Sequence, residues 1–327
     1  MSILVTGGAG YIGSCTVAAL KEKGYDVVVV DNLSKGHKEA LQDTKLYVGS
    51  VGDESFMDRV FTENKIEAVM HFAAFSLVGE SMVHPYEYYN NNVAQSMHLF
   101  HSMVEHGVKN IVFSSTAATY GEPELNPISE EAPQQPINPY GQTKLAIEKM
   151  LKWFDVAYGL NSISLRYFNV AGAHPSGDIG EDHSPETHLI PIVLQTALGK
   201  REKLSIFGGD YPTKDGSCIR DYIHVMDLAE AHILAMEYMI KNNRSNAFNL
   251  GSGGGYSNLE ILNAARRVTG REIPSAIEER RPGDPPVLVA SSEKAERVLG
   301  WKRQYGIDDI IASAWSWHEK HPNGYSD

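Results

Sequence analysis

The stretch ILVTGGAGYIG, residues 3–13, decides the fold of this chain. It opens with an apolar run rich in β-branched side chains, which is typical of a buried parallel strand. The following run, SCTVAALKEKG at residues 14–24, predicts a helix. Between strand and helix the spacing G-x-x-G-x-x-G is formed by Gly7, Gly10 and Gly13. This order of strand, glycine turn and helix predicts the start of a dinucleotide-binding β-α-β unit.

A second buried strand, DVVVVDN at residues 26–32, completes the unit and closes with Asp31. Glycines let the backbone approach a pyrophosphate, and the free N–H groups at the helix start attract its charge. Asp31 is placed to accept hydrogen bonds from the ribose hydroxyls. Its carboxylate would repel a 2′-phosphate, so the sequence predicts NAD and not NADP as cofactor. We interpret Lys35 nearby as a solvated loop residue.

Composition limits the remaining classes of protein. The chain has 327 residues, of which 42% are hydrophobic and 21% charged, which suits a soluble α/β protein with one large or two smaller domains. Its net charge is -12, and no segment concentrates lysine and arginine, which argues against nucleic acid as a partner. The two cysteines fit a reducing compartment. We recognise no signal peptide and no membrane-spanning run of about 18 apolar residues, so we expect a cytoplasmic protein.

Strands and helices continue to alternate up to about residue 170. EAVMHFAA (67–74) and NIVFSST (110–116) predict buried strands, with a helical stretch at 85–106 between them. A helix at 140–158 precedes a further strand within NSISLRYFNVAG, residues 161–172. The alternation predicts an α/β fold with a Rossmann-type doubly wound parallel sheet, whose ligands lie at the carboxyl ends of the strands.

The texture of the sequence changes after Gly172, where loops rich in Pro and Gly replace the regular alternation. We therefore expect two domains. Residues 1–170 would form an NAD-binding Rossmann domain, with a helical return near 221–240. Residues 171–327 would form a smaller mixed α/β domain that mainly binds the substrate.

The stretch NPYGQTKLAIE, residues 138–148, places Tyr140 and Lys144 four apart on one face of the expected helix. A hydride can leave an alcohol carbon only if a base takes the hydroxyl proton, and a free Tyr keeps its own proton up to about pH 10. The Lys144 ammonium and a cationic nicotinamide ring would stabilise the phenolate and lower the pKa of Tyr140. Thr116, at the end of a strand, can relay the proton. We predict these three residues as catalytic.

The glycine spacing and the Tyr-x-x-x-Lys pair resemble those of the extended short-chain dehydrogenases/reductases. Nucleotide-sugar dehydratases of that superfamily carry an acidic residue after the hydroxyl residue, because eliminating water requires an added proton donor and acceptor. Here Ala117 and Ala118 follow Thr116. We therefore expect a site that oxidises and reduces without eliminating water.

Over nearly its whole length the chain is similar to the UDP-galactose 4-epimerase family. The similarity rests on the motifs VTGGAGYIGS, VVVVDNLSKG, HFAAFSLVGES, YYNNNV, FSSTAATYGEP, NPYGQTK, LRYFNVAGA, FGGDYPTKDGSCIRDYIHVMDLA, NLGSGGGYS and RRPGDPP. It implies an isomerase that interconverts UDP-galactose and UDP-glucose with tightly bound NAD. Tyr140 would take the sugar 4-hydroxyl proton while NAD takes the C4 hydride. The 4-keto sugar then rotates, and the hydride returns to its other face. The family also implies a homodimer built through the helices at 92–106 and 140–157.

The resemblance implies a role for each matching residue. The adenosine and diphosphate of NAD would be held by Gly7, Gly10, Tyr11, Ile12, Gly13, Asp31 and Asn32. The rest of the cofactor cleft would comprise Ser50, Val51, Phe72, Ala73, Ala74, Asn91, Ser114, Tyr140, Lys144 and Tyr167. The substrate diphosphate would be clamped by Asn169, Arg220 and Arg281, with Phe207 at the uracil and Asp284 at the uridine ribose. The substrate site would be completed by Thr116, His188, Leu189, Tyr222 and Leu288.

Several positions depart from the common family pattern. The chain reads Ser50-Val51 after Gly49, where members often have Asp before an aliphatic residue, which affects the expected adenine contact. Ser76 stands where some members have Lys near the nicotinamide ribose, and His188 where some have Asn. At Leu288 a large aromatic residue is associated with excluding N-acetylated sugars and a small one with accepting them. Leu is intermediate, so the N-acetylhexosamine pair stays open.

Other functions also remain open from the sequence. The alternatives are an epimerase for another UDP-sugar pair (N-acetylhexosamine, pentose or uronate), an NAD-dependent dehydrogenase, and a non-catalytic NAD-binding regulator. A regulator has no need of Tyr140 and Lys144, which counts against it. His98 and His101 lie three apart on an expected helix, without Cys or a second acidic ligand at metal spacing, so we predict no metal site.

Overall fold

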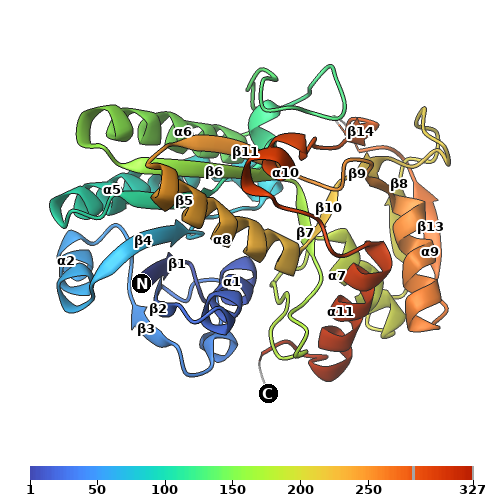
Figure 1. The fold of residues 1–327 in the computed structure, drawn as a ribbon. Coiled ribbons are helices and arrows are strands. Elements are labelled where there is room, and N and C mark those ends of the chain that lie inside the picture. Colours follow the sequence, from blue (N-terminus) through green and yellow to red (C-terminus); the bar gives the residue numbers. More distant parts are fainter. Residues whose placement is uncertain (282–283, 326–327) are drawn as a thin grey trace.

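The computed structural model describes residues 1–281 and 284–325, and a seven-stranded sheet forms its centre (Figure 1). The strand order is β11-β6-β5-β4-β1-β2-β3, and every neighbouring pair is parallel. The strands are β1 (Ser2–Thr6), β2 (Asp26–Asp31), β3 (Lys45–Val48), β4 (Ile66–His71), β5 (Asn110–Ser114), β6 (Asn161–Tyr167) and β11 (Asn246–Leu250). This confirms the predicted α/β fold with a Rossmann-type doubly wound sheet.

Helices cover both faces of this sheet (Figure 1). The helices are α1 (Tyr11–Glu22) and α8 (Val225–Asn242) on one face, and α2 (Glu54–Glu63), α5 (Gln95–Glu105) and α6 (Pro139–Tyr158) on the other. Along β1, Ile3 and Val5 pack in the core beside α1 and α8, whereas Leu4 packs in the core beside α2, α5 and α6. Because successive side chains of a strand point to opposite faces, a strand buried on both sides must be apolar throughout, as the sequence is here.

The sheet takes one strand from beyond the expected domain boundary at residue 170. β11 pairs in parallel with β6, and α8 supplies the crossover that a parallel neighbour requires. The helix near 221–240 was expected to return to the first domain, whereas the strand at 246–250 was assigned by sequence to the second half. Its pairing with β6 is a contact between distant segments, which no local pattern reports.

Most of the remaining C-terminal elements surround a separate apolar core, which contains Leu194, Ile261 and Ile311. The helices of this core are α7 (Leu189–Ala197), α9 (Asn258–Thr269) and α11 (Ile307–Lys320), which Figure 1 shows at the opposite end of the molecule from α2 and α5. The helix α10 (Glu293–Leu299) instead packs on the core of the large sheet, beside α8 and β11. The short strands are β7 (Asn169–Ala171), β8 (Leu204–Phe207), β9 (Ile219–Arg220), β10 (Tyr222–His224), β12 (Tyr256–Ser257), β13 (Ser275–Glu278) and β14 (Val287–Leu288). They pair as β10 with β7, β13 with β8, and β9 with both β12 and β14.

The helical stretch expected at 85–106 is divided into segments. After α3 (Val78–Val83), it consists of α4 (Pro85–Tyr88), a π-helical segment (Tyr89–Ala94) and α5. Within the π segment, Asn92 donates to the carbonyl of Phe75 and to the hydroxyl of Thr143, both at 3.0 Å. These bonds join the segment to the loop after β4 and to α6. Short 3₁₀ helices occur at Lys38–Leu41 and Ala117–Tyr120.

A membrane span would need a long and strongly apolar helix, and residues 1–281 and 284–325 contain none.

Candidate active site

A cavity of about 1390 Å³ opens at the carboxyl ends of β1, β2, β4 and β5. Its lining includes every residue expected to bind the cofactor. These are Gly7, Gly10, Tyr11, Ile12, Gly13, Asp31, Asn32, Ser50, Val51, Phe72, Ala73, Ala74, Asn91, Ser114, Tyr140, Lys144 and Tyr167. Residues that are far apart in the sequence therefore meet at one edge of the sheet, as the fold rule for parallel sheets predicts.

The glycine turn is packed too closely for larger residues. Gly7 has a φ of +71°, and a Cβ there would lie 2.5 Å from the backbone nitrogen of Ala73. A Cβ on Gly13 would lie 2.2 Å from the carbonyl oxygen of Gly7. Gly10 caps the N-terminus of α1 without a side-chain hydrogen bond. The start of α1 therefore presents backbone to the cavity, which suits an anionic diphosphate.

Asp31 is fixed at the end of β2 with its carboxylate among the cavity-lining groups. One oxygen accepts from the N–H of Ala9 at 2.9 Å and the other from the N–H of Leu33 at 2.8 Å. Burial raises the pKa of this carboxyl group, while the two N–H donors oppose the shift. A carboxylate oxygen has more than one lone pair, so these bonds leave acceptor capacity for ribose hydroxyls.

The predicted catalytic residues lie together at the start of α6. The side chain of Asn138 caps this helix by accepting from the N–H of Gly141 at 2.8 Å. Lys144 is 3% exposed, and its Nζ donates to the carbonyl of Ser114 at 2.8 Å. Tyr140, Lys144 and Thr116 all line the cavity, and the Thr116 side chain acts to lower the pKa of Tyr140.

The pKa of Tyr140 shifts upward within the protein alone. Burial raises it to about 12, and the Thr116 side chain opposes this only in part. We had expected Lys144 and the nicotinamide ring together to lower it. The Lys144 Nζ lies 6.0 Å from the centre of the Tyr140 ring, and burial lowers the pKa of Lys144 itself to about 7. Lys144 is therefore only partly charged at neutral pH, and burial is the main cause of the upward shift of the Tyr140 pKa.

A buried polar network joins α6 to β6 and to the residue that follows β5. Glu148 lies one helical turn after Lys144 and forms an ion pair with Arg166 at 2.5 Å. The same carboxylate accepts from Ser115 Oγ at 2.5 Å, and Arg166 Nη1 donates to the Tyr120 hydroxyl at 2.8 Å. The sequence interpretation did not include Glu148. Its position four residues after Lys144, on the same helix face, was the signal that could have indicated it.

The structure places the expected substrate residues in two groups. Among the cavity-lining residues are Thr116, Asn169, His188, Arg281, Asp284 and Leu288. Outside that lining lie Leu189, Phe207, Arg220 and Tyr222.

Two of the expected substrate contacts are already engaged with other protein groups. Arg220 forms an ion pair with Asp284 at 3.1 Å and donates to the carbonyl of Pro285 at 2.8 Å. The guanidinium carbon of Arg281 lies 3.9 Å from the ring centre of Phe207, a cation–π contact. Arg220 therefore contacts Asp284, and Phe207 contacts Arg281, but neither Arg220 nor Phe207 lines the cavity itself.

The cavity lining also includes residues that the sequence interpretation missed. Between β7 and α7 the chain reads EDHSPETH at 181–188, and the residues of this segment that line the cavity include Glu181, His183 and Glu186. Only His188 of this segment was predicted. The signal that could have indicated the other residues is the high proportion of histidine and acidic residues in this short segment.

Together, the sheet, the glycine turn and the Tyr–Lys pair define a dinucleotide-binding protein with a site for oxidising and reducing an alcohol. Residues 3–251 match the NAD dependent epimerase/dehydratase family, and the chain belongs to this family.

Comparison with curated proteins gives closely similar relatives over the full chain. The chain is 59% identical to a protein named UDP-glucose 4-epimerase from Halalkalibacterium halodurans, covering 100% of this chain and 98% of the relative. It is 58% identical to the UDP-glucose 4-epimerase of Lacticaseibacillus casei, covering 100% and 99%. These findings confirm the resemblance to the UDP-galactose 4-epimerase family that the motifs indicated.

Solved structures agree with these relatives. A crystal structure of a UDP-glucose 4-epimerase superposes with a TM-score of 0.98 at 55% identity, covering 100% of both chains. The enzyme from Brucella ovis in complex with NAD gives 0.94 at 46% identity, covering 96% of this chain and 97% of that one. The enzyme from Bifidobacterium longum in complex with NAD⁺ and UDP gives 0.93 at 43% identity, covering 99% and 100%. The predictions of an NAD-dependent enzyme of the isomerase class, with NAD as cofactor, are thereby confirmed.

Proposed function

We propose that this chain interconverts UDP-galactose and UDP-glucose by inverting sugar C4 through a transient 4-keto sugar. One observation carries the proposal: Tyr140, Thr116 and Lys144 line the same cavity as the glycine turn of the dinucleotide-binding unit. Ala117 and Ala118 follow Thr116, so the acidic residue of the dehydratases is missing from that position. Such a site suits reversible oxidation of a hydroxyl group. The names of the full-length relatives support the galactose/glucose pair.

Tyr140 takes the proton of the sugar 4-hydroxyl, directly or through Thr116, and returns it after the sugar has turned. Bound NAD supplies the hydride acceptor and then the hydride donor at C4, together with the positive ring that favours phenolate. Lys144 titrates near pH 7, so an adjacent phenolate would hold it in the protonated form. A protonated Lys144 and the positive nicotinamide ring would both lower the pKa of Tyr140 from the value of about 12 that burial gives it.

The residues around the cavity fit NAD. The close approach of Gly7 and Gly13 leaves room for a diphosphate where a Cβ would not fit, and Asp31 faces the expected ribose. We propose that the cofactor is held by residues 1–170 together with the return through α8 and β11. Most of residues 171–327 would then hold the nucleotide sugar.

In the substrate half, we propose that Asn169, Arg281 and His188 contact the UDP-sugar diphosphate. Asp284 would accept from the uridine ribose, and Arg220 would fix Asp284 through their ion pair at 3.1 Å. For the expected residues outside the cavity lining, we propose that Phe207 supports Arg281 and that Leu189 and Tyr222 support the surrounding backbone.

The experiment mixes purified protein with UDP-galactose, adds no NAD, and follows the sugar anomeric signals by NMR. Appearance of UDP-glucose up to a fixed ratio would support epimerisation with retained cofactor. Tyr140→Phe should fold and contain NAD but turn over about 10²–10⁴-fold more slowly, the usual contribution of a positioned acid–base group. Tyr25→Phe is the matched control, because its hydroxyl bonds to Glu237 on the surface. Unchanged turnover in Tyr140→Phe would remove the phenol from the mechanism.

We also propose a cytoplasmic homodimer formed through α5 and α6. Large apolar side chains are exposed on and beside these helices, including Tyr89, Met97, Trp153 and Val156. Isolated exposed apolar residues are common, whereas a group of this size marks an interaction surface. Light scattering of the parent protein and of Trp153→Glu tests the dimer, which the charged residue should weaken. A monomeric parent protein would contradict the proposal.

A further inference from the structure

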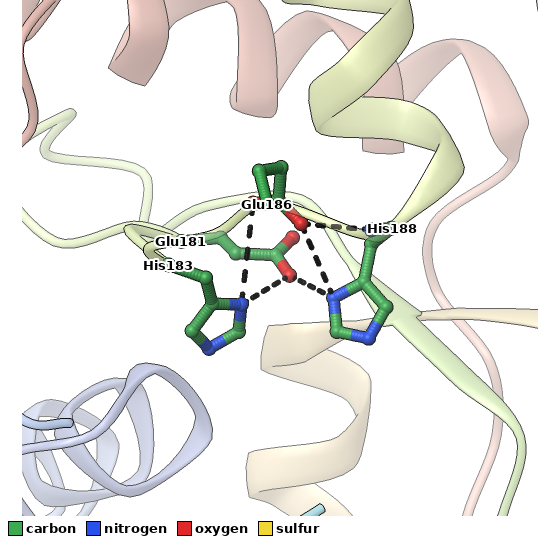
Figure 2. A group of neighbouring side chains, drawn as sticks. All are labelled: Glu181, His183, Glu186 and His188. Atoms are coloured by element: carbon green, nitrogen blue, oxygen red, sulfur yellow. Dashed lines mark hydrogen bonds and ion pairs between the residues drawn. The ribbon is translucent and has the colours of Figure 1, made fainter. Parts of the chain in front are cut away.

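Four side chains between β7 and α7 bring their polar atoms together, as Figure 2 shows. Glu181, His183, Glu186 and His188 each offer one nitrogen or oxygen atom, and these four atoms all lie within 4.8 Å of one another. Glu181 Oε1 lies 3.2 Å from His183 Nδ1 and 2.5 Å from His188 Nδ1. The carboxylate of Glu186 lies 4.0 Å and 3.8 Å from the same two nitrogens.

Hydrogen bonding does not fully account for this cluster. The Nδ1 atom of His183 is buried and makes no hydrogen bond, although it lies 3.2 Å from Glu181. The side chains of Glu181 and Glu186 are both 4% exposed, whereas those of His183 and His188 are 28% and 44% exposed, so the two carboxylates lie together on the buried side of the cluster. Buried polar atoms usually have partners, and neighbouring buried carboxylates repel each other. A cation between them would satisfy the nitrogen and remove the repulsion.

The donor set identifies the class of cation. Two imidazole nitrogens with two carboxylate oxygens are the ligands of Zn²⁺ and related divalent ions, whereas Ca²⁺ and Mg²⁺ prefer oxygen alone. With bonds of about 2.0–2.1 Å, a tetrahedral site sets its ligand atoms roughly 3.3 Å apart. The carboxylate-to-imidazole separations of 2.5 to 4.0 Å extend on both sides of that value. We propose that Glu181, His183, Glu186 and His188 form a binding site for a divalent transition metal ion of the zinc class.

The surroundings give this site a structural role. The indole of Trp317 on α11 donates to the carbonyl of Glu181 at 3.1 Å, and the ring of Tyr11 on α1 lies 6.5 Å from that of His183. His188 is the N-cap residue of α7. A metal ion here would fix a loop that contacts helices from both halves of the chain. The metal is not needed for the proton and hydride transfers proposed above, although His188 would contact both the metal and the substrate diphosphate.

Metal binding is compatible with the substrate contact proposed for His188. The cluster uses the Nδ1 atoms of both histidines, which leaves the Nε2 atom of His188 for a phosphate oxygen. A ligating histidine commonly donates from its second nitrogen. The proposal reverses our expectation of no metal, which considered only His98 and His101. In the structure, His98 lies 2.8 Å from Glu54 at the surface.

The test adds Co²⁺ and then Zn²⁺ to purified full-length protein from which metal has been removed by a chelator. We expect one equivalent of Co²⁺ to bind with the strong visible absorption of tetrahedral coordination, and Zn²⁺ to displace it. His183→Gln should raise the Kd of Co²⁺ by more than the roughly 10–100-fold that loss of an outer partner causes. His98→Gln is the matched control and should bind like the parent protein.

A second variant covers the case in which His183→Gln does not fold. Glu186→Gln keeps size and shape while removing one charged ligand, and it should also weaken Co²⁺ binding. Zn²⁺ should raise the thermal unfolding midpoint of the parent protein more than that of this variant. The proposal is overturned if the parent protein gives no tetrahedral Co²⁺ spectrum, or if Glu186→Gln binds Co²⁺ as tightly as the parent. Neither readout depends on epimerase activity.

Discussion

Replacing Glu148 with glutamine removes the charge that faces Arg166 inside the protein. The Arg166 and Glu148 side chains are only 7% and 9% exposed. Arg166 Nη2 lies 2.5 Å from one carboxylate oxygen of Glu148, and Nε lies 3.0 Å from the other. Glutamine has nearly the same shape, but its amide offers one acceptor oxygen and carries no charge. The variant therefore leaves the guanidinium buried without its counter-ion.

The expected loss follows from that geometry. Removing one partner of a buried ion pair destabilises a protein by about 3–5 kcal/mol, because the remaining charge stays out of water. The total stability of a natural protein is only about 5–15 kcal/mol. The Ser115 hydroxyl, 2.5 Å from Glu148, can still donate a hydrogen bond to the amide oxygen of glutamine. This contact therefore adds little to the loss of stability. We expect Glu148→Gln to lose about 3–5 kcal/mol of unfolding free energy.

Equilibrium unfolding in urea measures this free energy, with equal NAD in every sample. Glu54→Gln is the matched control, because its pair with His98 is exposed and such pairs contribute about 0–1 kcal/mol. The double replacement of Glu148 and Arg166 by Met should recover much of the loss, since apolar residues often replace a buried pair without cost. A loss in Glu148→Gln no larger than in the control would refute the reasoning.

The remaining predictions concern the site itself. Burial lowers the pKa of Lys144 from 10.5 to about 7. Between pH 7 and pH 10.5 the unfolded chain therefore binds more protons than the folded protein. The free energy of unfolding of the parent protein thus increases as the pH rises through this range. Lys144→Met should therefore exceed the parent in stability below pH 7, by on the order of 5 kcal/mol, and the gain should fade toward pH 10. Urea midpoints from pH 6 to 10 test this, and a constant difference would contradict it. Gly13→Ala should lose retained NAD, measured as nucleotide released on denaturation, because its Cβ would lie 2.2 Å from the carbonyl of Gly7. Gly254→Ala, with nothing within 4 Å, should keep its NAD, and equal NAD content in both variants would disprove the steric argument. Arg281→Ala should raise the KM for UDP-galactose at least about tenfold with a smaller change in kcat, and an unaltered KM would exclude the proposed diphosphate contact.

Local patterns in the sequence predicted the cofactor half of the site. The glycine spacing, Asp31 and the Tyr140–Lys144 pair are properties of short segments, in which backbone geometry and residue spacing fix where the side chains point. Because neighbouring strands of a parallel sheet run in the same direction, their carboxyl ends lie at the same edge of the sheet. For this reason the glycine turn, Asp31 and the Tyr140–Lys144 pair line one cavity, together with the cofactor-binding residues that only the family resemblance implied.

The substrate half was less predictable because it is assembled from short elements that are distant in sequence. The Arg220–Asp284 ion pair at 3.1 Å and the position of Arg281 over Phe207 depend on how these elements pack. The family motifs in the sequence predicted which residues belong to the substrate site. They did not indicate which of those side chains would form ion pairs or cation–π contacts with other residues of the protein.

The sequence by itself determined the strand–turn–helix unit and the preference for NAD, and it predicted the Tyr140–Lys144 pair as the acid–base group, because each depends on residues that are close together in the chain. Only the tertiary structure decided that β11 joins the sheet, that burial raises the pKa of Tyr140 to about 12, and that Glu181, His183, Glu186 and His188 converge. Strand pairing, desolvation and the meeting of charged groups all depend on which surfaces the folded chain removes from water, and that is set by long-range packing.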